Sequence, residues 1–285
     1  MVEVIVFRNR ASKLGAILSK LGLEAVLALE DLDPQRVAVL AIRDIDGSWA
    51  PVYTLLLALV SYKLSIRGEE WWRSYAEFLS QRRSPESLSD VVNDVIEFVK
   101  SSRGASIKRE EKIKRIEKAY RNSKVLLEVL YSDNDIIYTR AGEILQDLAK
   151  SLGVPEDSKT LVFAIKMAYY ATRRPGDFAT VSGIDVIPVD LRVACISYSS
   201  FLVDADSYRT LLKERKAVSK AWSLVSKTSG IPLIHLDSLL WLTGWAPRDL
   251  SLEKARDVVS ETLSRVVSRE LAENVARELC LRKCR

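Results

Sequence analysis

From Ser12 onward, apolar side chains recur every three or four residues in nearly every segment of the chain, and the interruptions at glycine and proline are short. Apolar residues at this spacing line one face of an α-helix. With 11 glycines and 8 prolines in 285 residues, turns are too infrequent for a β-sandwich or β-barrel. The sequence therefore predicts an all-α chain of about a dozen helices, without internal repeats, a long linker or a sharp domain boundary.

Short-range signals set the ends of the expected helices. Asp33 is a favourable N-cap with Pro34 at the first helical position, and Asp237 is expected to cap a late helix. Met1 to Arg8 alternates apolar and polar residues, which indicates a short strand or a packed N-terminal arm. The expected helices are residues 12–21, 23–29, 35–43, 52–64, 71–81, 87–101, 106–131, 135–152, 159–173, 190–200, 204–228 and 238–243, with two more after Ser251.

The net charge of +5 is a mild excess, and its distribution is more informative than its size. Residues 103–124 hold nine basic side chains against three acidic ones, and residues 209–227 hold six against one. Such blocks are either solvated helix faces or surfaces that neutralise the phosphates of a nucleic acid. The apolar run at residues 50–62 is too short to span a bilayer, so no membrane partner is expected.

Three cysteines, Cys195, Cys280 and Cys284, bear on the compartment and on metal binding. An odd count without a secretory signal favours a reducing cytoplasm. Cys280 and Cys284 are four residues apart, so on a helix they would share one face and could bind a metal or oxidise. The four-cysteine motif of an iron–sulfur cluster is absent from the sequence. We interpret the three as structural or incidental residues of a cytoplasmic protein that needs no metal or redox cofactor.

Lys166 is the one charged residue between Thr160 and Thr172, and apolar and aromatic residues surround it. If that face of the helix points inward, desolvation disfavours the charged form of the amine and produces a nucleophile near neutral pH. The alternative is a lysine whose ammonium group extends along the helix surface to solvent. Both interpretations are open from the residues alone.

Asp190 follows Pro188 and Val189 and precedes another apolar helical run. An aspartate at this position is a good N-cap. A capping carboxylate has a fixed orientation, so Asp190 can also present a charge to a binding site. The two roles are compatible.

Residues 152–159, LGVPEDSK, form a short connection between two expected helices, and we call this connection the hairpin. A loop that leads into a helix N-terminus exposes backbone N–H groups and can hold a phosphate. The alternative is a plain turn between helices.

Five tryptophans have two interpretations as well, since flat indoles either stack on an extruded base or fill the core. These five are Trp71, Trp72, Trp222, Trp241 and Trp245.

Five segments in consistent order carry a resemblance to a known family. They are DPQRVAV from Asp33, ALVSYKLSIRGEEWW from Ala58, KTLVFAIKMAYYA from Lys159, IPVDLRVA from Ile187 and IPLIHLDSLLWLTG from Ile231. Together they resemble the archaeal 8-oxoguanine DNA glycosylase (AGOG) family, a divergent branch of the helix-hairpin-helix DNA glycosylases. The hairpin lacks the Gly-x-Gly core that is common in that superfamily, although this branch has an unusual hairpin. Residues 246–285 are left without an assigned role.

The resemblance implies a single glycosylase unit across residues 1–285, built of two intertwined helical lobes with the active site in the cleft between them. The helix-hairpin-helix region would lie at about residues 135–173. The resemblance also implies roles for seven residues. The Schiff-base nucleophile would be Lys166 and the catalytic aspartate Asp190, the two indoles around the base would be Trp72 and Trp241, and the other substrate-binding residues would be Gln35, Pro188 and Asp237.

The function implied by the resemblance is excision of 8-oxoguanine from DNA followed by strand cleavage through a lysine Schiff base and β-elimination. The expected partner is double-stranded DNA, with single-stranded DNA left open. Neither a metal nor a redox cofactor is required, which suits a chain with one histidine, His235. Three alternatives are a non-catalytic helical DNA-binding protein, the same fold acting on another oxidised purine, and a helical protein-interaction scaffold.

Overall fold

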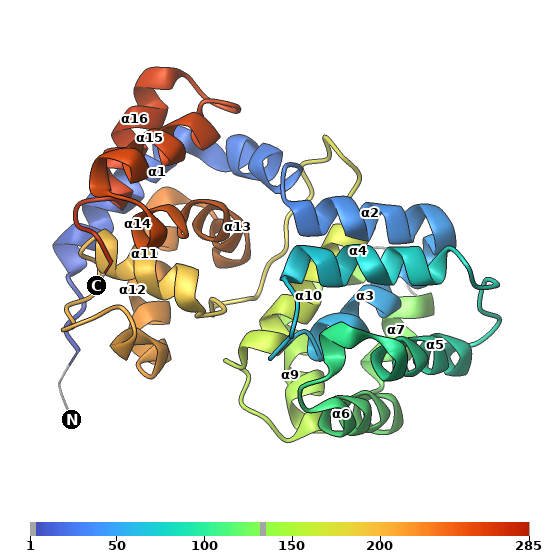
Figure 1. Cartoon of the computed structure of the whole chain (residues 1–285). Coiled ribbons are helices and arrows are strands. Elements are labelled where there is room, and N and C mark those ends of the chain that lie inside the picture. The colour runs from blue at the N-terminus through green and yellow to red at the C-terminus, as the bar shows by residue number, and fades with distance from the viewer. Residues whose placement is uncertain (1–3, 132–134, 285) are drawn as a thin grey trace. The chain divides into compact units, whose positions relative to one another are not determined.

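The computed structural model describes residues 4–131 and 135–284, and every regular element in them is a helix (Figure 1). The all-α prediction is confirmed. The chain divides into two compact units, of which unit 1 contains Met1–Glu30 and Asp185–Arg285 and unit 2 contains Asp31–Ile184. Unit 1 is therefore built from both ends of the chain. Within the described residues no helix has the length and apolar character needed to cross a membrane.

Unit 2 is organised around α3 and α10, which pack against each other. All ten residues of α3 are buried, because the helix is apolar on every side. The elements of unit 2 are α2 (Pro34–Asp46), η1 (Gly47–Trp49), α3 (Ala50–Leu59), α4 (Gly68–Leu79), α5 (Leu88–Ser101), η2 (Arg103–Ala105), α6 (Arg109–Asn122), α7 (Val125–Tyr131), α8 (Asp135–Thr139), α9 (Ala141–Leu152) and α10 (Lys159–Thr172).

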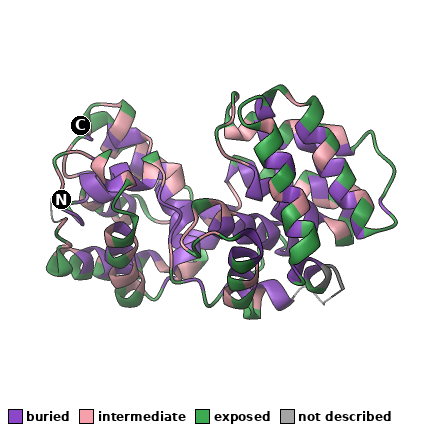
Figure 2. Cartoon of the chain, turned by 90° about the horizontal axis from the view of Figure 1, so that it is seen from below, coloured by how far each residue is buried: buried purple, intermediate pink, exposed green. Residues whose placement is uncertain are grey.

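Unit 1 is organised around α1, which packs against α12, α13 and α16. In Figure 2 the buried residues gather on the inner sides of the helices and the exposed residues on the outer sides. The elements of unit 1 are α1 (Arg8–Glu30), α11 (Leu191–Ser199), η3 (Thr210–Leu212), α12 (Arg215–Ser229), α13 (Leu233–Thr243), α14 (Ala246–Asp249), α15 (Leu252–Leu263) and α16 (Arg269–Leu279).

The local signals placed several helix ends correctly. Asp33 caps α2 by accepting a hydrogen bond from the Gln35 backbone N–H, and Pro34 is the first helical residue. Gly22 has φ 79° and divides α1 into two helical parts, as predicted. Residues 4–7 form an arm rather than a strand, with one isolated bridge between Val6 and Val203, and the side chains of Ile5 and Phe7 are exposed.

Three expected long helices are divided or shorter than predicted. In two of them, a residue from a distant part of the chain forms hydrogen bonds at the position where the helix was expected to continue. The predicted helix 106–131 is α6 and α7, since Asp147 accepts hydrogen bonds from the Ser123 hydroxyl and the Val125 N–H between them. The predicted helix 204–228 begins only at Arg215. Its first residue, Asp204, instead donates its N–H to the carbonyl of Ile5. The predicted helix 135–152 is divided into α8 and α9 at residue 140.

The prediction that Asp237 caps a helix is wrong. Helix α13 begins at Leu233 with Pro232 at the N-cap position, so Asp237 lies inside the helix and is 4% exposed. Proline fixes φ and has no N–H to lose, which makes it a suitable residue at a helix start. Asp237 is therefore a buried acid in a helix, and it is not part of a turn.

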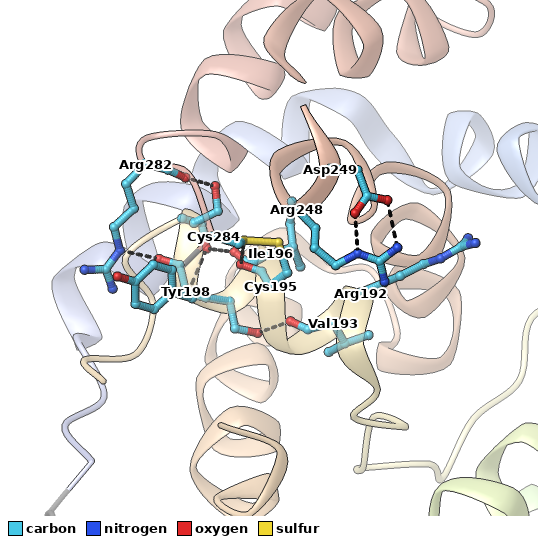
Figure 3. Close-up of a disulfide and its surroundings, with 12 residues drawn as sticks. Arg192, Val193, Cys195, Ile196, Tyr198, Arg248, Asp249, Arg282 and Cys284 are labelled. Carbon is cyan, nitrogen blue, oxygen red and sulfur yellow. Dashed lines mark hydrogen bonds and ion pairs between the residues drawn. A yellow bond between two sulfur atoms is a disulfide. The ribbon is translucent and has the colours of Figure 1, made fainter. Parts of the chain in front are cut away.

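The structural interpretation of the cysteines is confirmed for two of them, because Cys195 and Cys284 form a disulfide (Figure 3). Their sequence separation of 89 residues gave no sign of the pairing. Helix α16 ends at Leu279, so Cys280 and Cys284 do not share a helix face. Cys280 is a free, buried thiol. The bond ties the last residues of the chain to α11.

Candidate active site

Lys166 lies on α10 and is 2% exposed. The alternative of a lysine that reaches solvent is therefore wrong. Its ammonium nitrogen lies 5.7 Å from the ring centroid of Tyr170, one helical turn later. An aromatic face attracts a cation, so Tyr170 gives this ammonium a favourable neighbour within unit 2.

A buried polar network fixes α10 against α2. The Tyr170 hydroxyl donates to Asp33 Oδ2 at 3.1 Å, while Asp33 Oδ1 caps α2. Arg36 is fully buried and donates to the carbonyls of Tyr170 and Arg173. Asp31 pairs with both Arg36 and Arg173, which gives each of the two buried guanidinium groups a counter-ion. The helix that carries Lys166 thus has a fixed position relative to the helix that carries Gln35.

Gln35 and Trp72 complete the part of the predicted site that lies in unit 2. Gln35 is 7% exposed, and its Nε2 lies near Gly68 at the start of α4, at van der Waals distance (3.5 Å) from where a Cβ on that glycine would be. Trp72 on α4 packs edge-to-face on Phe163 of α10, with ring centroids 6.1 Å apart. Phe163 is three residues before Lys166 and shares its side of the helix.

The two adjacent tryptophans of α4 have different environments. Trp71 donates its indole N–H to the Ser61 hydroxyl and its ring packs on Phe98, so it is a core residue. Trp222 is also core, fully buried with its N–H bound to Ser197. Trp72 is therefore the tryptophan of this pair whose ring packs on α10.

Asp190 is the N-cap of α11 in unit 1. Its Oδ1 accepts hydrogen bonds from the backbone N–H groups of Arg192 at 2.8 Å and Val193 at 3.0 Å. Pro188, two residues earlier, is buried and anchors the segment that leads into the cap. The capping role is confirmed. It also fixes the direction of the carboxylate, which is partly exposed.

Arg192 is a residue of this site that the sequence analysis missed. Its guanidinium carbon lies 3.8 Å from the Trp241 ring centroid, and Nη1 donates to the Trp241 carbonyl at 2.9 Å. Arg192 therefore joins α11 to α13 and covers one face of an indole that is only half-buried. The available signal was its position inside the IPVDLRVA segment, directly after the capping aspartate.

Glu30 is a second residue in contact with α13 that the sequence did not indicate. Glu30, at the end of α1, is fully buried, and its Oε1 lies 2.9 Å from His235 Nδ1 and from the Ser238 hydroxyl. These two contacts flank Asp237 along the helix. Asp237 and Trp241 are four residues apart, so they lie on the same side of α13.

The predicted site residues form two groups, one in each unit. Gln35, Trp72 and Lys166 gather in unit 2 around α10. The other group, in unit 1 around the start of α11 and the middle of α13, consists of Pro188, Asp190, Asp237 and Trp241. Among the described residues no cluster of three His, Cys, Asp or Glu side chains could hold a metal ion. The two groups of predicted site residues include an amine, two carboxylates and two indoles.

Comparisons with known proteins identify the family. The model of the AGOG family, described as N-glycosylase/DNA lyase, matches residues 15–277. An N-glycosylase/DNA lyase from Aeropyrum pernix is 41% identical over 261 residues, which is 90% of each chain. The chain belongs to the AGOG family of N-glycosylase/DNA lyases. This membership replaces the alternatives of a non-catalytic DNA-binding protein and an interaction scaffold.

Other AGOG relatives have similar coverage. An N-glycosylase/DNA lyase from Pyrobaculum aerophilum is 34% identical over 231 residues, 80% of this chain and 84% of its own length. A crystal structure of an 8-oxoguanine DNA glycosylase from the same organism, complexed with 8-oxoguanosine, superposes with a TM-score of 0.75 at 29% identity. It covers 95% of this chain and 97% of its own. The AGOG match reaches residue 277, so most of the tail that had no assigned role is part of the family region.

Proposed function

We propose that this AGOG protein excises 8-oxoguanine from DNA and then cleaves the strand on the 3′ side of the lesion. The observation that carries the proposal is Lys166, a buried lysine that lies on α10 between Phe163 and Tyr170. The name of the Pyrobaculum aerophilum protein, an 8-oxoguanine DNA glycosylase complexed with 8-oxoguanosine, supports the choice of lesion. Action on genomic DNA places the protein at the nucleoid.

Lys166 is the nucleophile. Its neutral amine attacks C1′ of the deoxyribose, and the glycosidic bond breaks as the base leaves with the bonding electrons and takes up a proton. Opening of the sugar ring converts the adduct into a Schiff base. The iminium carbon acidifies the C2′ proton, and loss of that proton expels the 3′ phosphate by β-elimination. The attack requires the amine in its neutral form.

Asp190 assists the first step. The proposed roles are to accept the proton of the attacking amine or to stabilise the positive charge that develops on the sugar. Two backbone N–H groups already bind Oδ1, so the orientation of the carboxylate is set before substrate arrives. A preorganised charge needs little rearrangement in the transition state.

The remaining site residues bind the extruded base. Trp72 and Trp241 are the indoles that would stack on its two faces. Gln35 supplies an acceptor for the N7–H that distinguishes 8-oxoguanine from guanine, and Asp237 and Pro188 contact the base or its sugar. Arg192, which packs on Trp241, would hold that indole in its stacking position.

The hairpin between α9 and α10 would hold a phosphate of the same strand. Gly153 ends α9 in the left-handed conformation, with φ 66°. Ser158 occupies the N-cap position of α10, but its side chain makes no capping bond to the first turn. A phosphate oxygen can take that place at the positive end of the helix.

Borohydride trapping on a duplex with a single 8-oxoguanine tests the proposal. Reduction of the Schiff base should give a covalent protein–DNA adduct with the wild type and none with Lys166→Gln. Lys254→Gln is the matched control, since Lys254 is exposed on α15 and lies outside the proposed site. An adduct that persists in Lys166→Gln would refute the assignment. Duplexes with other oxidised purines and a single-stranded substrate, run in parallel, measure the lesion and strand preferences.

A further inference from the structure

Three cations lie along one side of α6 in unit 2. Arg109, Lys112 and Arg115 are spaced three residues apart, so successive side chains are neighbours on the helix. Lys112 is 0% exposed, and its Nζ lies 3.4 Å from the carbonyl of Lys63 and 5.4 Å from the Tyr62 ring centroid. In the part of the chain that the structure describes, none of the three forms an ion pair with a carboxylate.

This arrangement is electrostatically unfavourable on its own. Burial and the neighbouring Arg109 lower the pKa of Lys112, and burial lowers that of Arg115. The Nε atoms of Arg109 and Arg115 are buried and lack a hydrogen-bond partner. Buried cations and unsatisfied donors are costly unless an anion compensates them. The first turn of α6 contains two acids, the exposed Glu110 and Glu111, and Glu111 is paired with Lys108.

Backbone strain occurs at the edge of the same group. Lys63 and Lys108 have φ values of 45° and 58°, in the left-handed region that residues with a Cβ avoid. The Lys63 carbonyl accepts from Lys112, and the Lys108 carbonyl accepts from the Lys112 N–H, so both strained residues contact the middle cation. Strain of this kind concentrates at binding and catalytic sites.

The group borders the hairpin. Arg115 Nη2 donates to Thr160 Oγ1 at 2.8 Å, and Thr160 is the second residue of α10. The Arg115 guanidinium also lies 5.9 Å from the Tyr62 ring centroid. Through Tyr62 and Arg115, the loop before α4 and the first turn of α10 meet at one basic surface.

We propose that Lys63, Arg109, Lys112 and Arg115, the α6 cation cluster, bind a phosphodiester group of the DNA backbone in addition to any phosphate held at the hairpin turn. The inference rests on the DNA substrate of the proposed function. Arg109, Arg115 and the exposed Lys63 reach the phosphate oxygens. The buried Lys112 adds a positive charge below these side chains, where the low dielectric strengthens its attraction for the phosphate. The incoming phosphate supplies the anion that the cluster lacks.

The test is the salt dependence of binding to an undamaged duplex, measured by fluorescence anisotropy. Each phosphate that the protein neutralises contributes roughly 0.9 to the slope of log K against log salt concentration. Arg109→Gln/Arg115→Gln should reduce the slope by about one phosphate contact or more. Arg109→Lys/Arg115→Lys should restore most of it, because lysine keeps the charge.

The matched control is Lys114→Gln/Arg121→Gln. Both residues are exposed on the opposite side of α6, and the change in net charge is the same. A loss of slope equal to that of the cluster variant, or no loss in either, would overturn the proposal. If the arginine variant unfolds, Lys63→Asn is measured instead, because asparagine tolerates the left-handed backbone at this position. An unchanged salt slope in that variant would count against the site. An undamaged duplex is bound but not excised, so a failed trapping experiment at Lys166 leaves this measurement valid.

Discussion

The Tyr170 hydroxyl donates a hydrogen bond to Asp33 Oδ2 over 3.1 Å, and this bond joins the helix of Lys166 to the cap of the helix of Gln35. Both residues are buried in unit 2. The bond therefore sets how far apart the proposed nucleophile and the proposed base-binding amide can lie. Replacing Tyr170 by phenylalanine removes only the hydroxyl group, so this variant tests the relationship directly.

Tyr170→Phe should lower the free energy of unfolding by about 1 to 3 kcal/mol, because a buried carboxylate oxygen loses a donor. Excision should slow as well, since α2 and α10 are no longer held together by this bond. Thermal unfolding and single-turnover excision measure the two effects. Tyr120→Phe is the control, because Tyr120 is exposed on α6. Equal stability of Tyr170→Phe and wild type would show that the bond does not hold the helices.

Asp190 has a capping role that can be separated from a catalytic one. Asn is as good an N-cap as Asp, so Asp190→Asn should keep the stability of α11 while excision is lost with the negative charge. Asp190→Ala should lose excision and also about 1 kcal/mol of stability. Lesion binding, thermal unfolding and excision are compared for both variants. An Asp190→Asn protein that excises at the wild-type rate would reduce Asp190 to a cap alone.

Arg192 should act through Trp241. Arg192→Met keeps an apolar chain over the indole but removes the cation and the hydrogen bond to the Trp241 carbonyl. The expected result is weaker lesion binding by roughly two- to thirty-fold, corresponding to about 0.5 to 2 kcal/mol of lost cation–π interaction. Binding to undamaged DNA should change much less. Equal weakening on both duplexes would assign Arg192 to backbone contact instead.

Short-range features of this chain were predictable from sequence because their physical cause lies within a few residues. Asp33 with Pro34, the kink at Gly22 and the Asp190 cap each depend on backbone groups one to four positions away. The position of Lys166 on an apolar helix was equally visible. Which elements would pack against this helix was not visible, because Asp33, which contacts Tyr170, and Trp72, which contacts Phe163, come about 90 to 140 residues earlier in the chain.

The features that sequence missed depend on long-range partners. Asp147 interrupts the predicted helix 106–131 from another element, and Glu30 reaches α13 across 205 residues to contact His235. The prediction that Asp237 caps a helix was wrong because proline also favours a helix start, and α13 begins at the proline five residues earlier. The pairing of Cys195 with Cys284 is a property of tertiary structure that no local spacing reveals.

The free thiol of Cys280 should make the protein sensitive to alkaline pH. Burial raises its pKa to about 12, well above that of a thiol in an unfolded chain. Below the unfolded pKa the thiol is neutral in both states and its contribution to stability is complete. As pH rises from there towards 12, the unfolded state loses the proton first and stability falls. The unfolding temperatures of wild type and Cys280→Ala should therefore converge as pH rises over this range. A difference between them that stays constant with pH would contradict the burial argument.

The disulfide between Cys195 and Cys284 should stabilise unit 1 by restricting the unfolded chain. Closing a loop of 89 residues is expected to stabilise the folded state by about 4 to 5 kcal/mol when only the entropy of the unfolded chain is counted. This value is an upper bound, because measured effects of disulfides are often smaller. Cys195→Ala and Cys284→Ala should each lower the unfolding temperature, and adding a dithiol reductant to them should change nothing further. The same reductant should destabilise wild type and Cys280→Ala alike, because Cys280 is outside the bond. A wild-type unfolding temperature that does not respond to complete reduction would show that the hydrogen bonds of Leu281 and Arg282 to Ser199 hold the C-terminal segment without it.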